Sequence, residues 1–276
     1  MIPKRFIFYW SGTNMSWLRY ISIYSAKFYN PDFEIILYYS KDIDKQSLPE
    51  RNDNKVIENY FEFLESKNII LKEWNFNIDR YKHKTVDGWS KIAPAQKCDI
   101  LQWEKLYQDG GIFCDSDIIF LKPFDVRYLK FDMLTCFKKY FTVGFWASRP
   151  NEEMMLDFYS NAIFTFDEYN YQTAGVSNIL SVLKQKLETI DCNKFKSLRL
   201  AYPNLNIFNL PFETFYRWDY NNLNNIYKKN IKIHPTQLGI HWYGGHVDSK
   251  FWIDTLNPKS INNYNNTICN ALRRIK

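Results

Sequence analysis

Continuous apolar runs and spaced apolar stripes alternate along the chain. Short runs rich in β-branched and aromatic residues predict β-strands, and apolar residues three and four apart predict amphipathic helices. The predicted strands are residues 5–9, 33–39, 69–76, 112–121, 133–137, 143–147, 231–234 and 238–242. The predicted helices are residues 17–28, 56–64, 92–108, a segment that starts at 150–153, 176–190 and 260–276. Strand, helix and strand in this order imply parallel pairing with a right-handed crossover.

This order of elements predicts an α/β fold with a Rossmann-like mixed sheet flanked by helices. The 276 residues are enough for a full core and commonly form one unit, so we expect a single domain over residues 1–276.

Two aspartates interrupt the apolar segment 112–121. Asp115 and Asp117 lie between the runs Ile-Phe-Cys and Ile-Ile-Phe-Leu, with no lysine or arginine between them. A buried carboxylate is costly unless another group compensates its charge. Residues i and i+2 of an extended segment point the same way, so the two carboxylates offer the oxygen donors that Mg²⁺ and Mn²⁺ prefer. We interpret this acidic pair as a site for a metal-bound diphosphate.

The alternative for the acidic pair is a structural acidic turn. Another Asp-x-Asp triplet, residues 42–44, is flanked by lysines in a polar segment, and there we favour the solvated turn. The apolar surroundings of residues 115–117 favour a functional role, because burial makes unpaired carboxylates costly.

The helix predicted at 92–108 leads into the acidic pair. Pro94 lies in its first turn, and the Gly-Gly pair at 110–111 can adopt the left-handed conformation that ends a helix. Asp99 and Gln102, three residues apart, share one face of this helix. The sequence therefore places a carboxylate and an amide just before the acidic strand.

Composition narrows the possible functions. The net charge of +6 is modest, and no basic stripe accompanies a groove-reading helix, so nucleic acid is not an expected partner. No run approaches the roughly 18 to 20 apolar residues that span a bilayer, and residues 1–4 do not open a signal peptide. Five widely spaced cysteines indicate reduced thiols. We therefore expect a cytoplasmic protein.

Residues 97–101 and 110–117 resemble, in order and spacing, the sugar-binding Asp-x-Asp region of glycosyltransferase family 32. That family includes bacterial capsule and lipopolysaccharide enzymes, and the clostridial glucosylating toxins and glycosyltransferase family 8 are more distant relatives. The resemblance implies a GT-A-type fold and a nucleotide-sugar donor held through Mn²⁺ or Mg²⁺. The sequence departs from the family at Gln102, where an arginine that reaches the donor is usual.

Weaker resemblances lie outside this region. The opening strand is similar to the family strand whose tryptophan stacks on the nucleotide base, which assigns Phe8, Tyr9 and Trp10 to the donor site; by spacing alone Trp10 fits a core equally well. His241 starts a His-x-x-Gly segment that resembles the third metal ligand of family 8, and a core histidine is the alternative. Lys250 either reaches the diphosphate or is a surface lysine.

These assignments give a set of candidate residues. We expect catalytic roles for Asp115, Asp117 and Gln172, metal ligation by Asp115, Asp117 and His241, and donor binding by Phe8, Tyr9, Trp10, Asp99, Gln102, Ser116 and Lys250. Gln172 precedes the helix predicted at 176–190, where polar residues ordinarily act as caps. The expected metal neutralises charge on the departing diphosphate.

The resemblance implies a metal-dependent, retaining glycosyltransferase. It would move a sugar from a nucleotide-diphosphate sugar, with UDP-sugar favoured, to a hydroxyl of a glycan or lipid-linked acceptor, as in bacterial surface polysaccharide synthesis. The alternative is a catalytically silent nucleotide-sugar or glycan-binding module of a larger assembly, which the missing arginine at Gln102 favours. A nucleotidyl or phosphoryl transferase is a third hypothesis, but its glycine-rich phosphate cradle is not found.

Two further segments have open interpretations. Residues 260–276 form an apolar stripe beside basic residues, typical of a helix that lies on an anionic membrane or docks on its own domain. The first interpretation implies a peripheral location on the inner face of the cytoplasmic membrane. Residues 79–89 predict either a lid over the site or a plain surface loop.

Overall fold

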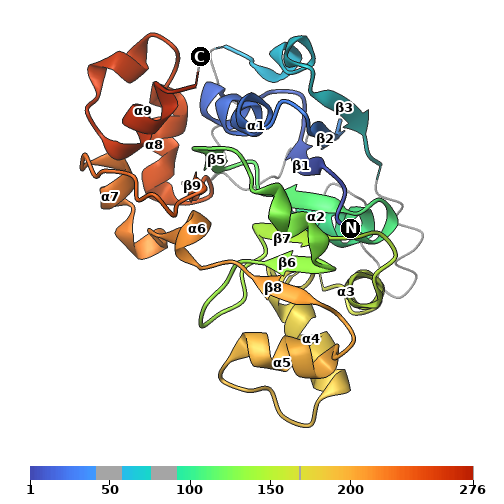
Figure 1. Cartoon of the computed structure of the whole chain (residues 1–276). Coiled ribbons are helices and arrows are strands. Elements are labelled where there is room, and N and C mark those ends of the chain that lie inside the picture. Colours follow the sequence, from blue (N-terminus) through green and yellow to red (C-terminus); the bar gives the residue numbers. More distant parts are fainter. Residues whose placement is uncertain (42–57, 76–91, 168, 276) are drawn as a thin grey trace.

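The computed structural model describes residues 1–41, 58–75, 92–167 and 169–275 and has the α/β architecture that the sequence predicts (Figure 1). Seven strands form one mixed sheet in the order β3-β2-β1-β4-β7-β6-β8, and two form a small antiparallel sheet, β5-β9. The strands are β1 (Arg5–Ser11), β2 (Glu34–Ser40), β3 (Ile70–Glu73), β4 (Gly111–Cys114), β5 (Ile118–Phe120), β6 (Met133–Thr135), β7 (Phe145–Ser148), β8 (Ile207–Asn209) and β9 (Gly239–His241). The helices are α1 (Trp17–Tyr29), α2 (Pro94–Gln108), α3 (Glu153–Phe164), α4 (Val176–Lys186), α5 (Lys194–Ala201), α6 (Glu213–Tyr216), α7 (Asn224–Tyr227), α8 (Val247–Thr255) and α9 (Thr267–Leu272).

The strand order fixes where a ligand can bind. β1 pairs in parallel with β2 on one side and with β4 on the other, because α2 carries the chain back past β1 after β3. In sheets of this kind the ligand crevice lies beyond the carboxyl ends of the strands, where the strand order reverses. Here that point lies between the ends of β1 and β4, next to Ser11 and Asp115.

The alternation of side chains along β1 builds two cores. Phe6, Phe8 and Trp10 pack in the core that includes residues of α1, α8 and α9, whereas Ile7 and Tyr9 pack in the core that includes α2, α3 and α4. Successive residues of a strand point to opposite faces. A strand covered on both faces therefore appears in the sequence as one continuous apolar run, as predicted for residues 5–9.

The helix ends depart in detail from the predicted ones. The N-cap of α1 is Ser16, and the N-cap of α3 is Glu152. Asn151 has φ +63° and lies in the turn before α3. The end of α2 follows the prediction, because Gly110 at φ +64° takes the left-handed conformation.

Several predicted elements differ from the structure. Residues 112–121 form two strands in different sheets, β4 and β5, with the acidic pair in the turn between them. Residues 231–234 form no strand, and α4 ends at Lys186 rather than at 190. In place of the helix predicted at 56–64, the described residues form short 3₁₀ turns. The elements α5, β8, α6, α7 and α8 have no predicted counterpart. Four of them are short helices, which depend on tertiary packing more than on local pattern.

The C-terminal segment is docked on the domain. Instead of one helix over 260–276, it forms a 3₁₀ turn, Ser260–Asn263, followed by α9. Ile268 and Leu272 of the predicted stripe lie in the core that covers one face of the large sheet, and Arg273 donates hydrogen bonds to the carbonyl groups of the turn and the residue after it. The stripe is therefore covered by protein rather than free to contact a bilayer.

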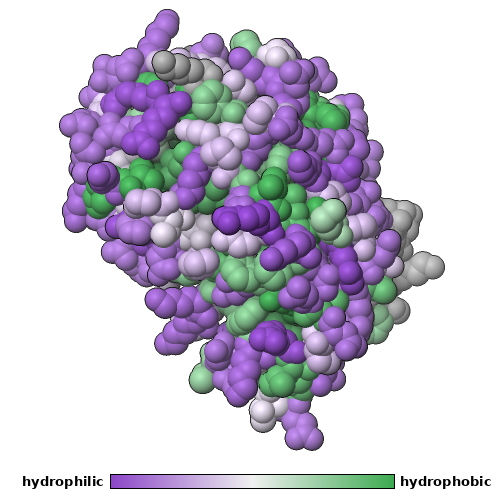
Figure 2. All heavy atoms as spheres, in the orientation of Figure 1, coloured by the Kyte–Doolittle hydropathy of each residue, from purple (hydrophilic) through white to green (hydrophobic). Residues whose placement is uncertain are grey.

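The described surface agrees with this packing. On the face shown in Figure 2, hydrophilic residues cover most of the surface and hydrophobic residues form small separate areas. Among the described helices, none combines the length and the apolar character that crossing a membrane requires.

Candidate active site

The acidic pair lies in a turn between the two sheets. β4 ends at Cys114, and the backbone N–H of Asp115 donates to the carbonyl of Gly144 at 2.9 Å. The N–H of Ile118 donates to the carbonyl of Asp115 at 3.1 Å, which closes the turn before β5. The prediction that an extended backbone aligns the two carboxylates is therefore wrong, and the turn brings them together instead.

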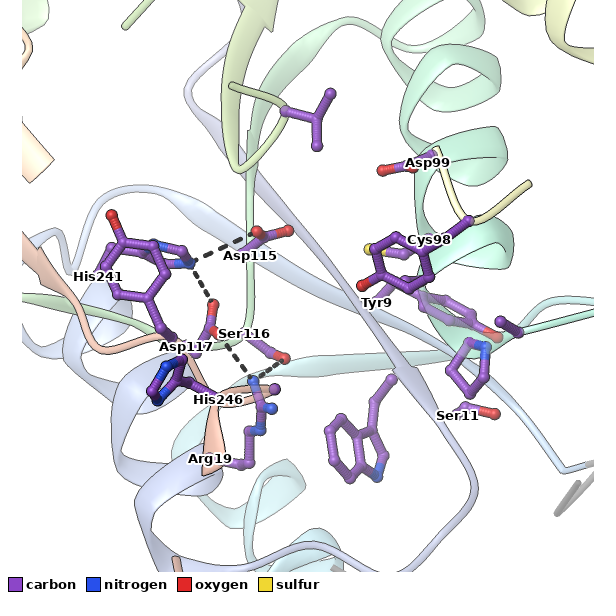
Figure 3. Close-up of a pocket in the computed structure, with 18 of the residues that line it drawn as sticks. Tyr9, Ser11, Arg19, Cys98, Asp99, Asp115, Ser116, Asp117, His241 and His246 are labelled. Atoms are coloured by element: carbon purple, nitrogen blue, oxygen red, sulfur yellow. Dashed lines mark hydrogen bonds and ion pairs between the residues drawn. The ribbon is translucent and has the colours of Figure 1, made fainter. Parts of the chain in front are cut away.

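The small sheet brings His241 to the acidic pair. β9 pairs with β5 so that His241 stands opposite Ile118, and the N–H of Trp242 donates to the carbonyl of Asp117 at 3.0 Å. The Nε2 atom of His241 lies 3.0 Å from Asp117 Oδ1 and 3.7 Å from Asp115 Oδ2 (Figure 3). One possible ligand atom from each of Asp115, Asp117 and His241 lies within 4.8 Å of the others. These three side chains can hold a metal ion.

The donor set fits a divalent cation. Two carboxylate oxygens and one imidazole nitrogen converge from a turn and a strand that backbone hydrogen bonds hold in place. The rings of Tyr243 and Tyr216, with centroids 4.0 and 5.3 Å from that of His241, restrict the imidazole. Three protein ligands leave coordination positions for water and a substrate phosphate, which is how such cations are usually bound.

The buried acids of the site differ in their charge compensation. Burial favours the neutral form of Asp117, but the charge and hydrogen bond of His241, the charge of Arg19 and the backbone N–H of Gly244 together lower its pKa. Burial alone would lower the pKa of His241, and the neighbouring Asp117 raises it instead. Burial, with a smaller contribution from the charge of Asp115, raises the pKa of Asp99 well above its usual value.

The three possible ligands line a pocket of about 650 Å³ at the sheet edge where the strand order reverses. The walls come from the end of β1, the start of α2, the acidic turn and the segments before α4 and α8. The lining residues are Tyr9, Trp10, Ser11, Arg19, Ala93, Pro94, Ala95, Cys98, Asp99, Asp115, Ser116, Asp117, Val143, Tyr171, Gln172, Tyr220, His241, Tyr243, Gly245 and His246.

Most of the candidate residues line this pocket. They are Asp115, Asp117, His241, Ser116, Asp99, Gln172, Tyr9 and Trp10. Phe8, Gln102 and Lys250 are not among the lining residues. Their predicted contacts with the donor are therefore not supported by the geometry.

The three candidates that do not line the pocket lie elsewhere for different reasons. Phe8 points to the opposite face from Tyr9 and is fully buried in the core, beside Phe6. Gln102 is also fully buried, and neither its amide nitrogen nor its oxygen has a hydrogen-bond partner among the described residues. Lys250 belongs to α8 and is partly exposed.

Asp99 and Gln172 both lie close to Gly175. A Cβ atom on Gly175 would lie 2.6 Å from Asp99 Oδ2 and 3.2 Å from Gln172 Oε1, so a glycine leaves room for both side chains. We refer to Asp99, Gln172 and Gly175 as the Asp99 side of the pocket. Asp115, Asp117 and His241 form the Asp117 side.

Arg19 is a site residue that the sequence analysis does not identify. It belongs to α1, and its Nη1 atom lies 3.3 Å from Ser116 Oγ and 3.5 Å from Asp117 Oδ2 (Figure 3). The only sequence signal is a charged residue inside the apolar part of a helix that follows the first strand. The lining residues Tyr171, Tyr220, Tyr243 and His246 carry no such signal, and the predicted lid, 79–89, lies outside the described residues.

Comparison with known proteins supports the fold. No protein-family model matches the chain, and no curated protein matches it. The chain is similar to the PaToxG glycosyltransferase, with 20% identity, coverage of 72% of this chain and 73% of that chain, and a TM-score of 0.50. The glycosyltransferase GlyE of Streptococcus pneumoniae has 11% identity over 100% of this chain and 60% of that chain, with a TM-score of 0.40. The galactosyltransferase LgtC, in complex with donor and acceptor sugar analogues, has 11% identity over 90% and 91% of the two chains and a TM-score of 0.41.

The likeness to PaToxG, at a TM-score of 0.50, shows a glycosyltransferase fold, which is of the GT-A type that the sequence predicts. At this level of identity the likeness concerns the fold alone. Membership of family 32 stays a prediction from residues 97–101 and 110–117.

Proposed function

We propose that this protein is a metal-dependent glycosyltransferase that transfers a sugar from a nucleotide-diphosphate sugar to an acceptor hydroxyl. One observation carries the proposal. Asp115, Asp117 and His241 converge at the carboxyl edge of a glycosyltransferase-type sheet, inside a pocket of about 650 Å³. Pockets of this size hold small-molecule ligands, and the reversal of strand order is where such sheets bind nucleotides.

The Asp117 side would hold the cation. Asp115 and Asp117 would each offer a carboxylate oxygen, and His241 would offer Nε2. A bound divalent cation neutralises the charge that builds on a departing diphosphate. We propose Mn²⁺ over Mg²⁺, because Mg²⁺ usually takes oxygen ligands only and the set here includes an imidazole nitrogen.

The Asp99 side would hold the donor sugar. Asp99 lies across the pocket from the acidic pair (Figure 3), and Gln172 also lines the pocket. Both side chains offer hydrogen bonds to sugar hydroxyls. Because burial favours the protonated form of Asp99, this side chain can donate as well as accept a hydrogen bond. Trp10 and Tyr9, at the end of β1, offer aromatic surface to a nucleotide base.

The finer features of the proposal come from the resemblance to family 32. We propose a UDP-sugar donor, retention of anomeric configuration and a glycan or lipid-linked acceptor of the kind used in bacterial surface polysaccharide synthesis. A cytoplasmic location agrees with these substrates. The resemblance of residues 110–117 supports this set, and each part is open to direct measurement.

A silent binding module is the second candidate function. Gln102, which replaces the arginine usual in the family, is buried outside the pocket and makes no described contact with it. The pocket would then bind a sugar nucleotide without transferring the sugar. Turnover separates the two functions.

The test is a screen of sugar nucleotides with Mn²⁺ by thermal shift, followed by a measurement of nucleoside diphosphate release. We expect one donor to raise Tm in the presence of Mn²⁺, since a ligand stabilises the folded state by mass action. Asp117→Ala should abolish that shift, and Glu188→Ala, at an exposed residue outside the pocket, should keep it. A donor that binds but is never cleaved would favour the binding module, and no cation-dependent binding would refute the proposal.

A further inference from the structure

Arg19 is a buried cation beside the acidic pair. Arg19 is 4% exposed, and it is the only lysine or arginine among the described residues that line the pocket. A buried charge is costly unless its surroundings compensate it. The groups around the guanidinium must therefore compensate its charge.

Aromatic rings and a glycine surround the guanidinium. The Cζ atom of Arg19 lies 4.7 Å from the ring centroid of Trp242 and 5.3 Å from that of Trp10. Trp242 is fixed in turn, because its Nε1 donates to Ser22 Oγ of α1 at 2.9 Å. A Cβ atom on Gly244 would lie 2.1 Å from Arg19 Nη2, so a glycine leaves the space that the guanidinium fills. A planar guanidinium suits such stacking better than an ammonium.

The two oxygens of Asp117 have separate partners. Oδ2 accepts the backbone N–H of Gly244 at 2.7 Å and lies 3.5 Å from Arg19 Nη1. Oδ1 lies 3.0 Å from Nε2 of His241, the nitrogen that would ligate a cation. The same carboxylate thus faces Arg19 with one oxygen and the cation position with the other.

The charge of Arg19 has opposite effects on the binding of a cation and on the binding of a diphosphate. A guanidinium one carboxylate away from a divalent cation repels it, whereas the same guanidinium attracts a diphosphate. A divalent cation carries two positive charges and Arg19 one, and Asp115 and Asp117 carry one negative charge each. Because His241 is neutral as a ligand must be, the occupied site has a net charge of +1. A diphosphate reverses that excess.

We propose that Arg19 makes cation binding depend on a diphosphate: its guanidinium weakens the binding of the cation alone and strengthens the binding of the cation together with a diphosphate. This inference rests on the proposed function of the pocket. It names Arg19 as the residue that couples the binding of the cation to the binding of the donor's diphosphate. By linkage, the cation and the diphosphate change each other's affinity by the same factor.

Calorimetric titration tests the coupling. Mn²⁺ alone, Mn²⁺ with pyrophosphate and Mn²⁺ with UDP are titrated into the wild-type chain, Arg19→Met and Arg127→Met. We expect Arg19→Met to bind Mn²⁺ alone on the order of tenfold more tightly and both diphosphate complexes on the order of tenfold more weakly. Arg127→Met removes the same charge from an exposed residue outside the pocket and should change neither affinity.

The direction of the two changes is decisive. If Arg19 has a structural role only, both affinities should fall, and if it has no role, neither should change. Either result overturns the inference, whereas binding of Mn²⁺ with a diphosphate by the wild-type chain would still support the proposed function. If the wild-type chain binds no Mn²⁺ with either diphosphate, the proposed function fails and the inference with it. If Arg19→Met does not fold, Arg19→Lys and Arg19→Gln give the same comparison, with coupling kept by lysine and lost by glutamine.

Discussion

The two sides of the pocket bury a carboxylate to the same extent and treat it in opposite ways. Asp117 and Asp99 are each 8% exposed. The pKa of Asp117 is lowered, because His241 and Arg19 outweigh the effect of burial, whereas burial and the charge of Asp115 raise the pKa of Asp99. Neighbouring cations, and not burial, thus decide whether an acid is prepared to ligate a metal or to hydrogen-bond as a neutral group.

The largest expected effect comes from the same Asp→Asn substitution on each side of the pocket. Asp117→Asn removes the ligand charge, so we expect the Mn²⁺ affinity measured by calorimetry with UDP present to fall by at least about 100-fold. Asp99→Asn should change that affinity only a few fold, because its carboxyl is not among the possible ligands. Equal losses in the two variants would contradict the division of the pocket into two sides.

His241 supplies the next largest effect. His241→Ala removes one of the three possible ligands and leaves both carboxylates, so we expect the same Mn²⁺ affinity to fall about 10- to 100-fold. His234→Ala, an exposed histidine outside the pocket, is the matched control. An unchanged affinity in His241→Ala would assign His241 to the core, as its aromatic neighbourhood alone suggests.

Each side also depends on a glycine. A Cβ atom on Gly144 would lie 2.6 Å from Asp115 Oδ2, and one on Gly175 equally close to Asp99 Oδ2, whereas one on Gly245 would meet nothing within 4 Å. We expect Gly144→Ala to lower Mn²⁺ affinity about tenfold and the free energy of unfolding by about 1–3 kcal/mol. Gly175→Ala should lower donor turnover with Mn²⁺ affinity kept.

Gly245→Ala controls for the substitution itself and should stay within about 0.5 kcal/mol of the wild-type chain. The measurements are denaturant unfolding, calorimetry and diphosphate release on all three variants. If all three alanines behaved alike, contact with the two carboxylates would not be the cause of the losses.

The first part of the fold follows from local pattern, and so does the position of the pocket. The run at 5–9 and the stripe that follows it predict β1 and α1 because both depend on short-range periodicity. The acidic pair is predictable because two charges in an apolar run require compensation. The split of 112–121 between two sheets is not, since β5 is defined by its pairing with β9, more than a hundred residues later.

The site residues divide along the same line. Tyr9 and Trp10 lie near the end of a strand that the pattern predicts, and both line the pocket. Their neighbour Phe8 does not line the pocket, because it points away from Tyr9 and lies deeper in the sheet than Trp10. The sequence does not predict the role of Arg19, because the rings of Trp10 and Trp242 beside its guanidinium come from opposite ends of the chain. Resemblance located His241, and pairing of distant strands placed it beside the acidic pair.

The smallest expected effect is a change in the pH dependence of stability in Asp99→Asn. It tests the Asp99 side of the pocket without any ligand. The raised pKa of Asp99 means that the folded chain binds this proton more tightly than the unfolded chain. That contribution is fully present below the unfolded pKa of about 4 and is lost as pH rises through the folded pKa. Asp99→Asn should therefore match the wild-type Tm in acid and exceed it near neutral pH, and each kcal/mol gained raises Tm by about 2–4 °C in a chain of this size.

Asp125→Asn gives the opposite sign and so controls for the substitution. Hydrogen bonds from Arg127 lower the pKa of the partly exposed Asp125. Its contribution to stability is therefore present above the unfolded pKa and is lost as pH falls through the folded pKa. Its asparagine variant should then be less stable than the wild-type chain near neutral pH and equal to it in strong acid. Near neutral pH the Tm of Asp99→Asn should lie above that of the wild-type chain, and the Tm of Asp125→Asn below it. This opposite behaviour would follow from the different neighbours of the two carboxylates. Parallel pH profiles would mean that Asp99 is compensated in the folded chain by a group that acts on it as Arg127 acts on Asp125.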